Sequence, residues 1–206
     1  MSSTINTAVD FSFPPPWKDA LEQLLPAQGS WTDEQYLLLT DHARLPVEFT
    51  DGFVEFLPLP TDRHQRILKR LLQAFDAFIS TRGGEVLFAP LRLRIRAGKY
   101  REPDLLLLLS ADDPRREDRC WLGADLVVEI VSPNDKKRDT VEKPADYAEA
   151  RIQEYWIVDP ESETIVVLEL EDGKYVEAGR YARGELAASV LLAGFFVDTA
   201  SVLGPR

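Results

Sequence analysis

The 206-residue chain has little of several residue types that mark whole classes of protein. Its single cysteine, Cys120, cannot form an internal disulfide, which excludes a disulfide-stapled secreted domain. The longest aliphatic run, Leu105 to Leu109, is far too short to span a membrane. Residues 1–20 lack the basic and apolar regions of a secretory signal. We therefore expect a cytoplasmic protein that does not contact a membrane.

Several hydrolase motifs are also missing. The chain contains no Gly-x-Ser-x-Gly elbow, no His-Glu-x-x-His pair and no glycine-rich loop of the kind that cradles phosphates. These absences argue against a hydrolase of acidic substrates unrelated to nucleic acid. What is present is ordinary for a globular protein, since 45% of the residues are hydrophobic and 29% are charged.

Basic charge is scarce overall, which argues at first against nucleic acid as a partner. The formal net charge is −11, and phosphate contacts require positive charge. The acidity is unevenly distributed, however. Residues 1–62 hold 2 basic and 10 acidic side chains and residues 152–206 hold 4 and 10, whereas residues 63–151 hold 18 and 15. The middle of the chain is therefore mildly basic, and its acidic flanks have solubility as their simplest explanation.

The pattern of apolar residues predicts one α/β domain over residues 31–206, preceded by an arm over residues 1–30 that contains three consecutive prolines. Helical spacing of apolar residues predicts a helix from Ile67 to Ile79, which Thr61 or Asp62 can cap and which Gly83-Gly84 ends. A short helix is expected after the N-cap residue Thr32. Two hairpins are expected around the turns Asp51-Gly52 and Asp172-Gly173.

Four further strands and one more helix are predicted between the hairpins. The strands are residues 91–96, with alternating apolar and basic side chains, and the apolar runs 104–109, 126–131 and 155–158. The helix is Val141 to Arg151, whose first turn contains Pro144. The resulting core order is α-β-β-β-α-β, with β-hairpins added at both ends.

Two carboxylates and a lysine stand out in this pattern. Asp104 opens a run of five leucines and Glu129 lies inside an apolar strand, where an unpaired carboxylate costs several kcal/mol. Lys143 opens the helix that follows the Glu129 strand and packs back over the sheet. Two carboxylates and a lysine suit a divalent cation with an activated water at a phosphodiester. The alternatives are a turn cap for Asp104, a structural salt bridge for Glu129 and an exposed helix position for Lys143.

Five separated blocks of sequence carry a family resemblance and together cover roughly residues 30–200. They are Val47 to Gly52, Pro60 to Ile67, Arg101 to Asp104, Leu126 to Pro133, and a last block of Asp139, Lys143, Tyr147 and Glu154 to Pro160. In the order and spacing of these blocks the chain resembles the Uma-two family of restriction-endonuclease-like proteins, a branch of the PD-(D/E)xK nuclease superfamily.

The resemblance implies a restriction-endonuclease-like core in which Asp104 and Glu129 bind Mg²⁺ or Mn²⁺. Superfamily members usually carry the lysine two residues after the glutamate, where this chain has Val131, and Lys143 matches the position to which the family moves it. By resemblance, Glu48 is a possible further acidic ligand, and His64 and Tyr147 belong to the same cleft. The implied oligomeric state is a homodimer.

Two departures from the family pattern concern the helix that carries Lys143. Pro144 directly follows the lysine, so the helix must begin near it. Family members often have glycine where this chain has Arg151, close to the end of that helix.

The leading hypothesis is thus a metal-dependent endonuclease that hydrolyses DNA, and two basic segments are candidate phosphate contacts. They are the strand residues Arg92, Arg94 and Arg96, expected beside the Asp104 strand, and the loop residues Lys136, Lys137 and Arg138. A solvated surface, or pairing with the acidic flanks, would explain these basic residues nearly as well. The alternative function is a catalytically silent module on a nuclease fold that binds nucleic acid or protein.

Overall fold

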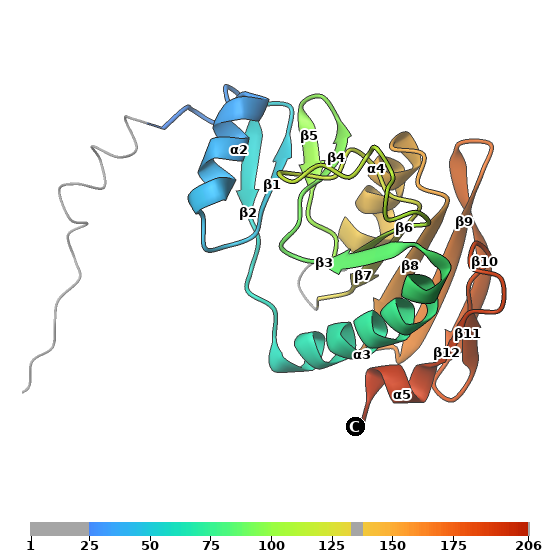
Figure 1. Ribbon diagram of the computed structural model, residues 1–206. Coiled ribbons are helices and arrows are strands. Elements are labelled where there is room, and N and C mark those ends of the chain that lie inside the picture. Colours follow the sequence, from blue (N-terminus) through green and yellow to red (C-terminus); the bar gives the residue numbers. More distant parts are fainter. Residues whose placement is uncertain (1–24, 133–137, 206) are drawn as a thin grey trace, which may run out of the picture.

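A computed structural model describes residues 25–132 and 138–205, and its centre is a six-stranded sheet of order β10-β9-β8-β7-β6-β3 (Figure 1). In chain order its strands are β3 (Glu85–Phe88), β6 (Leu105–Leu108), β7 (Leu126–Ile130), β8 (Glu154–Asp159), β9 (Thr164–Glu171) and β10 (Lys174–Ala182). Strands β7 and β8 run parallel, and the other neighbouring strands run antiparallel.

A second sheet, of order β2-β1-β5-β4, lies beside the first, and β11 pairs with β12. These strands are β1 (Val47–Thr50), β2 (Phe53–Phe56), β4 (Leu93–Arg96), β5 (Lys99–Arg101), β11 (Leu186–Ala188) and β12 (Phe196–Asp198). The helices are α2 (Asp33–His42), α3 (Asp62–Ile79), α4 (Lys143–Glu149) and α5 (Thr199–Leu203), with a 3₁₀ turn at Ser80–Arg82 and a π turn at Arg138–Glu142. No helix in the described part of the chain has the length and apolar character that a membrane crossing requires.

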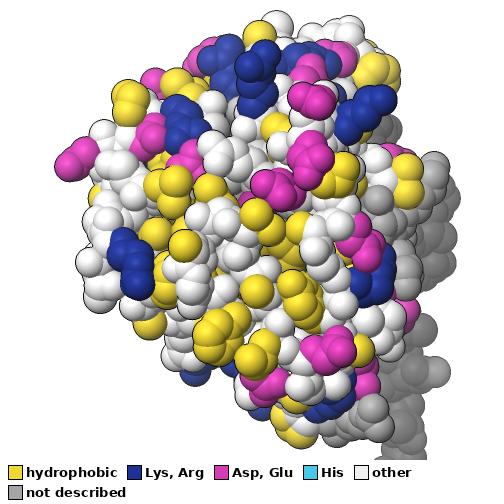
Figure 2. All heavy atoms as spheres, turned by 90° about the vertical axis from the view of Figure 1, so that its right-hand side faces the viewer, with side chains coloured by type: hydrophobic (Ala, Val, Ile, Leu, Met, Phe, Trp, Pro, Cys, Tyr) yellow, Lys and Arg dark blue, Asp and Glu magenta, His cyan; other side chains and the backbone are white. Residues whose placement is uncertain are grey.

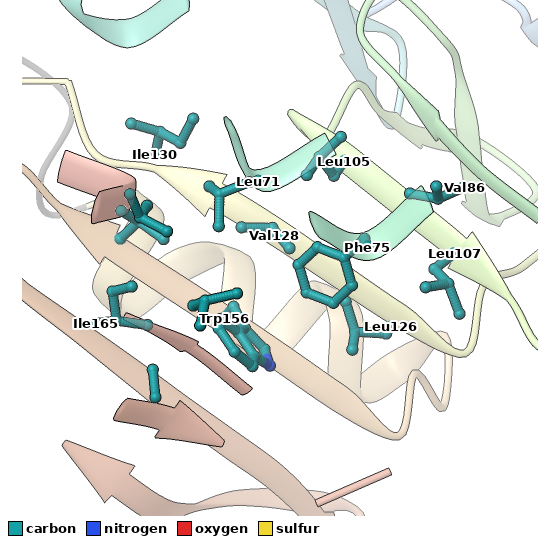
Figure 3. Packing of buried hydrophobic residues seen from close by; sticks show 14 of the residues in the cluster. Leu71, Phe75, Val86, Leu105, Leu107, Leu126, Val128, Ile130, Trp156 and Ile165 are labelled. Atoms are coloured by element: carbon teal, nitrogen blue, oxygen red, sulfur yellow. The ribbon is translucent and has the colours of Figure 1, made fainter. Parts of the chain in front are cut away.

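The central sheet is buried on both faces, and this explains the continuous apolar runs of its strands. Leu105 and Leu107 of β6 pack on the α3 side, whereas Leu106 and Leu108 pack on the α4 side. On the α3 side, Phe75 lies edge-on to Trp156 with 5.4 Å between the ring centroids (Figure 3). Trp156 is therefore a core residue. A third cluster of buried side chains joins α2 to the second sheet.

The local signals predicted the capped helices and the hairpins correctly. Thr32 caps α2 in a reciprocal arrangement with Gln35, and the Thr61 hydroxyl accepts a hydrogen bond at the start of α3. Strands β1–β2 and β9–β10 form the two expected hairpins. Of the expected arm 1–30, residues 1–24 lie outside the described residues, and Gln28 bonds the backbone of Val54.

The core order α-β-β-β-α-β is present as α3-β3-β6-β7-α4-β8, but the prediction chose the wrong first strand. The alternating segment 91–96 contributes β4, which pairs with β5 in the second sheet and is not a neighbour of β6. The true first strand is β3, which pairs with β6. Alternation identifies a strand with one buried face, but it does not say which sheet the strand joins.

The helix predicted over residues 141–151 is shorter, because the α-helical part is α4 and the turn before it is a π turn. Pro144 lies in the first turn of α4, as expected. After α4, Arg151 has φ of 56°, in the left-handed region where glycine is favoured. The departure from the family glycine therefore places an arginine in a strained backbone conformation.

We expect Arg151→Gly to raise the free energy of unfolding by about 0.5–1 kcal/mol, because the left-handed cost of roughly 1–2 kcal/mol exceeds the entropic cost of glycine. Ala150→Gly is the control, since Ala150 has φ of −76° and gains no relief. Urea unfolding of both variants measures the difference. An Arg151→Gly protein no more stable than the wild type would contradict the strain argument.

The face made by β9 to β12 carries basic and acidic side chains that are interspersed, with hydrophobic side chains between them (Figure 2). The exposed hydrophobic residues of these strands and their connections include Val176, Leu186, Val190 and Phe196. Among the described residues, this face therefore presents no extended surface of one charge sign.

Candidate active site

One cavity of about 330 Å³ is lined by several of the residues singled out in the sequence. It lies where the start of α3, the segments flanking the β1–β2 hairpin, and the adjoining ends of β6 and β7 come together. Its lining includes His64, Asp104, Glu129, Arg138 and Lys143. The topology therefore brings together side chains separated by up to 79 positions in the sequence.

The pairing of β6 with β7 places the two candidate carboxylates at the same end of adjacent strands. Leu105 pairs with Val128, so the antiparallel register continues to Asp104 and Glu129. Asp104 Oδ2 accepts a hydrogen bond of 2.7 Å from the backbone N–H of Ile130. The Asp104 carboxylate therefore does not cap a turn, because the N–H group that it binds belongs to the neighbouring strand β7.

Lys143 and Tyr147 converge on Glu129. The side chain of Glu129 shares the α4 side of β7 with Val127, and α4 places Lys143 and Tyr147 four residues apart on one helix face. Lys143 Nζ lies 2.8 Å from Glu129 Oε1, and the Tyr147 hydroxyl donates a hydrogen bond to the same oxygen. Burial, followed by the charge of Glu129, raises the pKa of Tyr147 well above its usual value, so the hydroxyl stays protonated and remains a donor.

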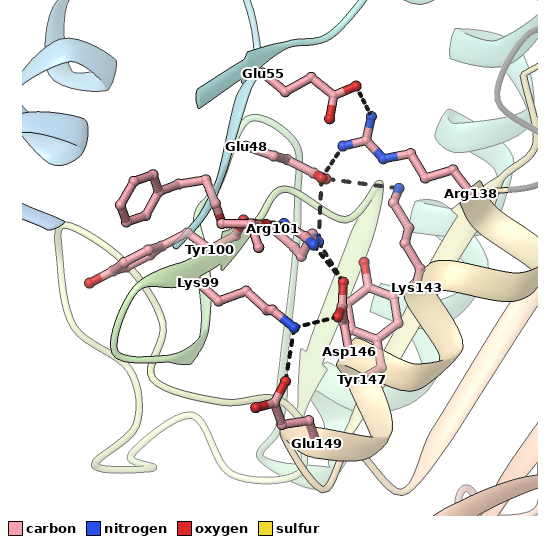
Figure 4. Close-up of polar contacts among 12 residues, drawn as sticks. Glu48, Glu55, Lys99, Tyr100, Arg101, Arg138, Lys143, Asp146, Tyr147 and Glu149 are labelled. Atoms are coloured by element: carbon pink, nitrogen blue, oxygen red, sulfur yellow. Dashed lines mark hydrogen bonds and ion pairs between the residues drawn. The ribbon is translucent and has the colours of Figure 1, made fainter. Parts of the chain in front are cut away.

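Glu48 of β1 is 1% exposed and lies at the centre of a group of cations (Figure 4). Its carboxylate lies 3.4 Å from Arg101 Nε and 4.0 Å from Lys143 Nζ, and it also accepts a hydrogen bond from Arg138. Burial would raise the pKa of Glu48, but the charges of Lys143, Arg101 and Arg138 outweigh it and lower the pKa. Glu48 is therefore ionised and pairs with these three cations, of which Lys143 also contacts Glu129.

His64, in the first turn of α3, borders the other carboxylate. Its Nε2 lies 3.1 Å from Asp104 Oδ2, and because an ionised carboxylate can only accept, the imidazole is the donor. The Thr61 cap fixes the start of α3 and hence the position of this ring. Of the six predicted carboxylate, lysine, histidine and tyrosine positions, four line the cavity: His64, Asp104, Glu129 and Lys143. Glu48 contacts Lys143 and Tyr147 contacts Glu129, but neither belongs to the lining.

An ion-pair network that sequence reasoning missed fastens α4 to β5. Asp146 is 8% exposed and binds both Lys99 Nζ at 2.7 Å and Arg101 Nη2 at 2.6 Å. Glu149 accepts a second hydrogen bond from Lys99. Asp146 follows Lys143 by three positions and so lies on the same helix face. This spacing was the sequence signal that could have identified Asp146 as a residue near the site. This network holds the helix that presents Lys143.

The basic residues proposed as phosphate contacts have different surroundings. Arg92 lines the cavity but bonds Asp41 at 2.8 Å, and Arg96 pairs with Asp51 and Glu149. Arg94 and Arg96 are not among the residues that line the cavity. Arg138 pairs with Glu55 as well as Glu48. Lys136 and Lys137 lie outside the described residues.

Two further cavity residues were not singled out by sequence reasoning. Arg44 is exposed on the rim and forms no ion pair with any described residue. Glu102 is 8% exposed, and within the described ranges no hydrogen-bond partner reaches its Oε2. Burial raises the pKa of Glu102 to about 7, and the nearby charge of Glu48 acts in the same direction. A backbone hydrogen bond from Val47 lowers the pKa but does not outweigh these two effects. Only its position two residues before Asp104 could have drawn attention to it.

We expect Glu102 to make the protein less stable as pH rises from about 4.5 to 7. The folded state binds the Glu102 proton more tightly than the unfolded chain, so ionisation in this window favours unfolding by a cost on the order of 3 kcal/mol. Glu102→Gln should therefore stabilise the protein at pH 8 and change little at pH 4. Urea unfolding at both pH values measures this, with the exposed Glu117→Gln as the control. An equal effect of Glu102→Gln at both pH values would contradict it.

The donor set suits a magnesium-type cation only if substrate and water complete the coordination. No group of three or more His, Cys, Asp or Glu side chains in residues 25–132 and 138–205 is arranged to hold a metal ion. Mg²⁺, however, is usually held by one or two carboxylates together with waters and substrate phosphates. Asp104 and Glu129 provide two such carboxylates in one cavity, and Asp104 Oδ1 has no hydrogen-bond partner among the residues described.

The core strands lie in the order β8-β7-β6-β3, with β8 parallel to β7. Helix α3 precedes these strands in the chain, and α4 lies between β7 and β8. This arrangement is a restriction-endonuclease-like fold. A solved structure supports this class: a "putative nuclease belonging to DUF820" from Anabaena variabilis ATCC 29413 superposes with a TM-score of 0.70. The two sequences are 16% identical, and the match covers 84% of this chain and 97% of that one. The comparison with curated proteins found no match.

The family follows from the sequence match over residues 33–200, which corresponds to the Uma2 family, described as "Putative restriction endonuclease". The chain belongs to this family. The resemblance seen in the five sequence blocks and the expected α/β fold class are both confirmed.

Proposed function

We propose that the protein is a metal-dependent endonuclease that hydrolyses phosphodiester bonds of DNA at the Asp104–Glu129 cavity. The observation that carries the proposal is the convergence of Asp104, Glu129 and Lys143 on one cavity in a chain of the Uma2 family. Mg²⁺ or Mn²⁺ bound by the two carboxylates would lower the pKa of a water molecule and offset negative charge on the phosphate.

The protein's own contribution is to hold charges in place before the phosphate arrives. Lys143 carries a buried ammonium beside Glu129, at the position where it can orient a water and stabilise the additional negative charge of the pentavalent phosphate. Glu48 and the Asp146 network keep that ammonium and its helix in place. Tyr147 and His64 orient Glu129 and Asp104 by donating hydrogen bonds to them.

Arg44 is the candidate contact for the DNA backbone, because its charge faces the cavity rim and is not used in an ion pair with a described residue. We expect Arg44→Ala to weaken DNA binding and to reduce the slope of log K against log salt concentration by about 1. The control is Lys174→Ala, at the β9–β10 turn and outside the cavity lining. Fluorescence anisotropy over a series of salt concentrations measures both, and an unchanged slope for Arg44→Ala would remove this role.

Incubation of the purified protein with supercoiled plasmid tests the proposed activity. Nicking is expected with Mg²⁺ or Mn²⁺ and is expected to stop when EDTA removes the cation. If no nicking occurs and calorimetry detects no bound cation, the alternative of a catalytically silent binding module replaces this proposal. A homodimer is the form that would allow cleavage of both strands, and light scattering of the purified protein measures its mass.

A further inference from the structure

The cavity has an apolar part that phosphodiester chemistry does not require. Besides the carboxylates and cations, its lining includes apolar residues from three segments, among them Ala43, Leu45, Leu57, Leu59, Ala89 and Pro90. A phosphate and a hydrated cation gain nothing from contact with such a surface. The apolar wall therefore points to a second, uncharged part of the ligand.

Most of the wall is built by the two connections that flank the β1–β2 hairpin, and Ala89 and Pro90 after β3 complete it. Residues 43–46 lead into β1, and residues 57–60 lead from β2 to the cap of α3. Leu45 and Leu59 line the cavity, and their side chains are 42% and 66% exposed. A ligand in the cavity could cover them. Exposed apolar side chains grouped at a concave site are typical of ligand binding.

The polar groups of the cavity restrict the chemistry of that ligand. Glu102 belongs to the same lining, and its Oε2, buried and without a hydrogen-bond partner among the described residues, would be satisfied by an N–H donor. Nucleobases combine flat apolar faces with N–H donors at their edges. A nucleotide also links its base covalently to the phosphate that lies at Asp104 and Glu129 under the proposed function.

We infer that this cavity takes up the base of one unstacked nucleotide adjacent to the phosphate bound at Asp104 and Glu129. The substrate class is accordingly DNA that contains an unpaired nucleotide, not a continuous duplex. A base within duplex DNA is stacked and paired, so a pocket can enclose it only after it leaves the helix. Leaving the helix costs a few kcal/mol less when the base is already unpaired. The position of the phosphate in this inference rests on the proposed function.

The experiment compares two DNA duplexes of identical sequence, one fully paired and one with a single unpaired nucleotide. Binding is measured by fluorescence anisotropy in EDTA, so that no cleavage occurs, and cleavage is measured separately with Mg²⁺ or Mn²⁺. We expect the bulged duplex to bind about tenfold more tightly, in line with the energy of one enclosed base. We expect it to be cut next to the unpaired nucleotide.

The Leu45→Ala/Leu59→Ala double variant tests the wall directly, because both side chains are exposed enough for the fold to survive their truncation. It should lose most of the preference for the bulged duplex, which is the ratio of the two affinities. The matched control is Leu38→Ala, because this leucine of α2 is 57% exposed, between the values for Leu45 and Leu59, and is not part of the cavity lining.

The two proposals fail separately in this design. Equal binding of the two duplexes, or a preference that the double variant retains, overturns the inference and leaves the wall to a different ligand. Metal-dependent cleavage of the paired duplex would then still support the proposed function. A binding preference that the double variant abolishes, without cleavage of either duplex, supports the base-binding pocket and refutes the proposed function.

Discussion

Replacing Asp104 by asparagine is expected to reduce metal-dependent DNA cleavage by roughly 10³-fold or more, because the substitution removes one of two carboxylate charges available to a cation. The change should leave the fold intact. An asparagine carbonyl oxygen can still accept the hydrogen bond from the Ile130 N–H that Asp104 Oδ2 accepts now. A loss of cleavage with an unchanged unfolding temperature is thus the expected result.

Calorimetry with Mn²⁺ adds a second readout for the Asp104→Asn variant. If Asp104 is a ligand, the affinity for the cation falls together with the cleavage rate. Asp112→Asn, an exposed aspartate in the loop after β6, is the matched control and should behave as the wild type. An Asp104→Asn variant that cleaves plasmid at the rate of the wild type would show that the cavity is not the active site.

Lys143→Met is expected to have two large effects. It removes the ammonium that lies 2.8 Å from Glu129, leaving a carboxylate that is 3% exposed without this counter-charge. Breaking a buried pair in this way costs about 3 kcal/mol or more in the free energy of unfolding. Methionine fills the space of the lysine stem, so lost packing contributes little to the change.

The second effect of Lys143→Met is the loss of cleavage without a loss of metal affinity. A cation at Glu129 would no longer compete with the ammonium for Oε1, so Mn²⁺ should bind at least as tightly as in the wild type. This separates Lys143 from Asp104, whose variant should lose both properties. Lys69→Met, at an exposed position of α3, controls for the loss of a positive charge. A stable Lys143→Met protein that still nicks plasmid would contradict the assigned role.

The parts of the fold that the sequence predicted well are those set by local pattern. The run from Leu105 to Leu108 shows no alternation because both faces of β6 are covered, and the apolar spacing in α3 matches the helix face that meets the sheet. The strand over residues 93–96 was detected but assigned to the wrong sheet. Its partner is chosen by long-range packing, which no local pattern specifies.

The site divides in the same way. Asp104 and Glu129 stood out because a carboxylate in an apolar strand must have a partner, and the partners of Glu129 turned out to be Lys143 and Tyr147. Ion pairs between charged residues that are far apart in the sequence could not be predicted. Arg138 meets Glu48 across 90 positions, and Arg101 meets Asp146 across 45, and nothing in either local sequence specifies the pair.

The charge distribution is also easier to understand in three dimensions. Among the described residues in the mildly basic middle of the chain, several arginines are used in ion pairs and do not present free positive charge, as Arg92, Arg96, Arg101 and Arg138 show. We therefore expect long-range attraction of DNA to be weak, and under the proposed function binding would depend on contacts within the cavity. This favours a substrate that can enter the cavity over one that lies across a flat surface.

The most direct test of the proposed activity is the rate of plasmid nicking in Mn²⁺ by the wild type, Asp104→Asn and Lys143→Met, measured side by side at equal folded concentration. The predicted result is nicking by the wild type that stops in EDTA, and no detectable nicking by either variant. Equal rates for the three proteins, or nicking by the wild type that persists in EDTA, would contradict a metal-dependent site built from these residues.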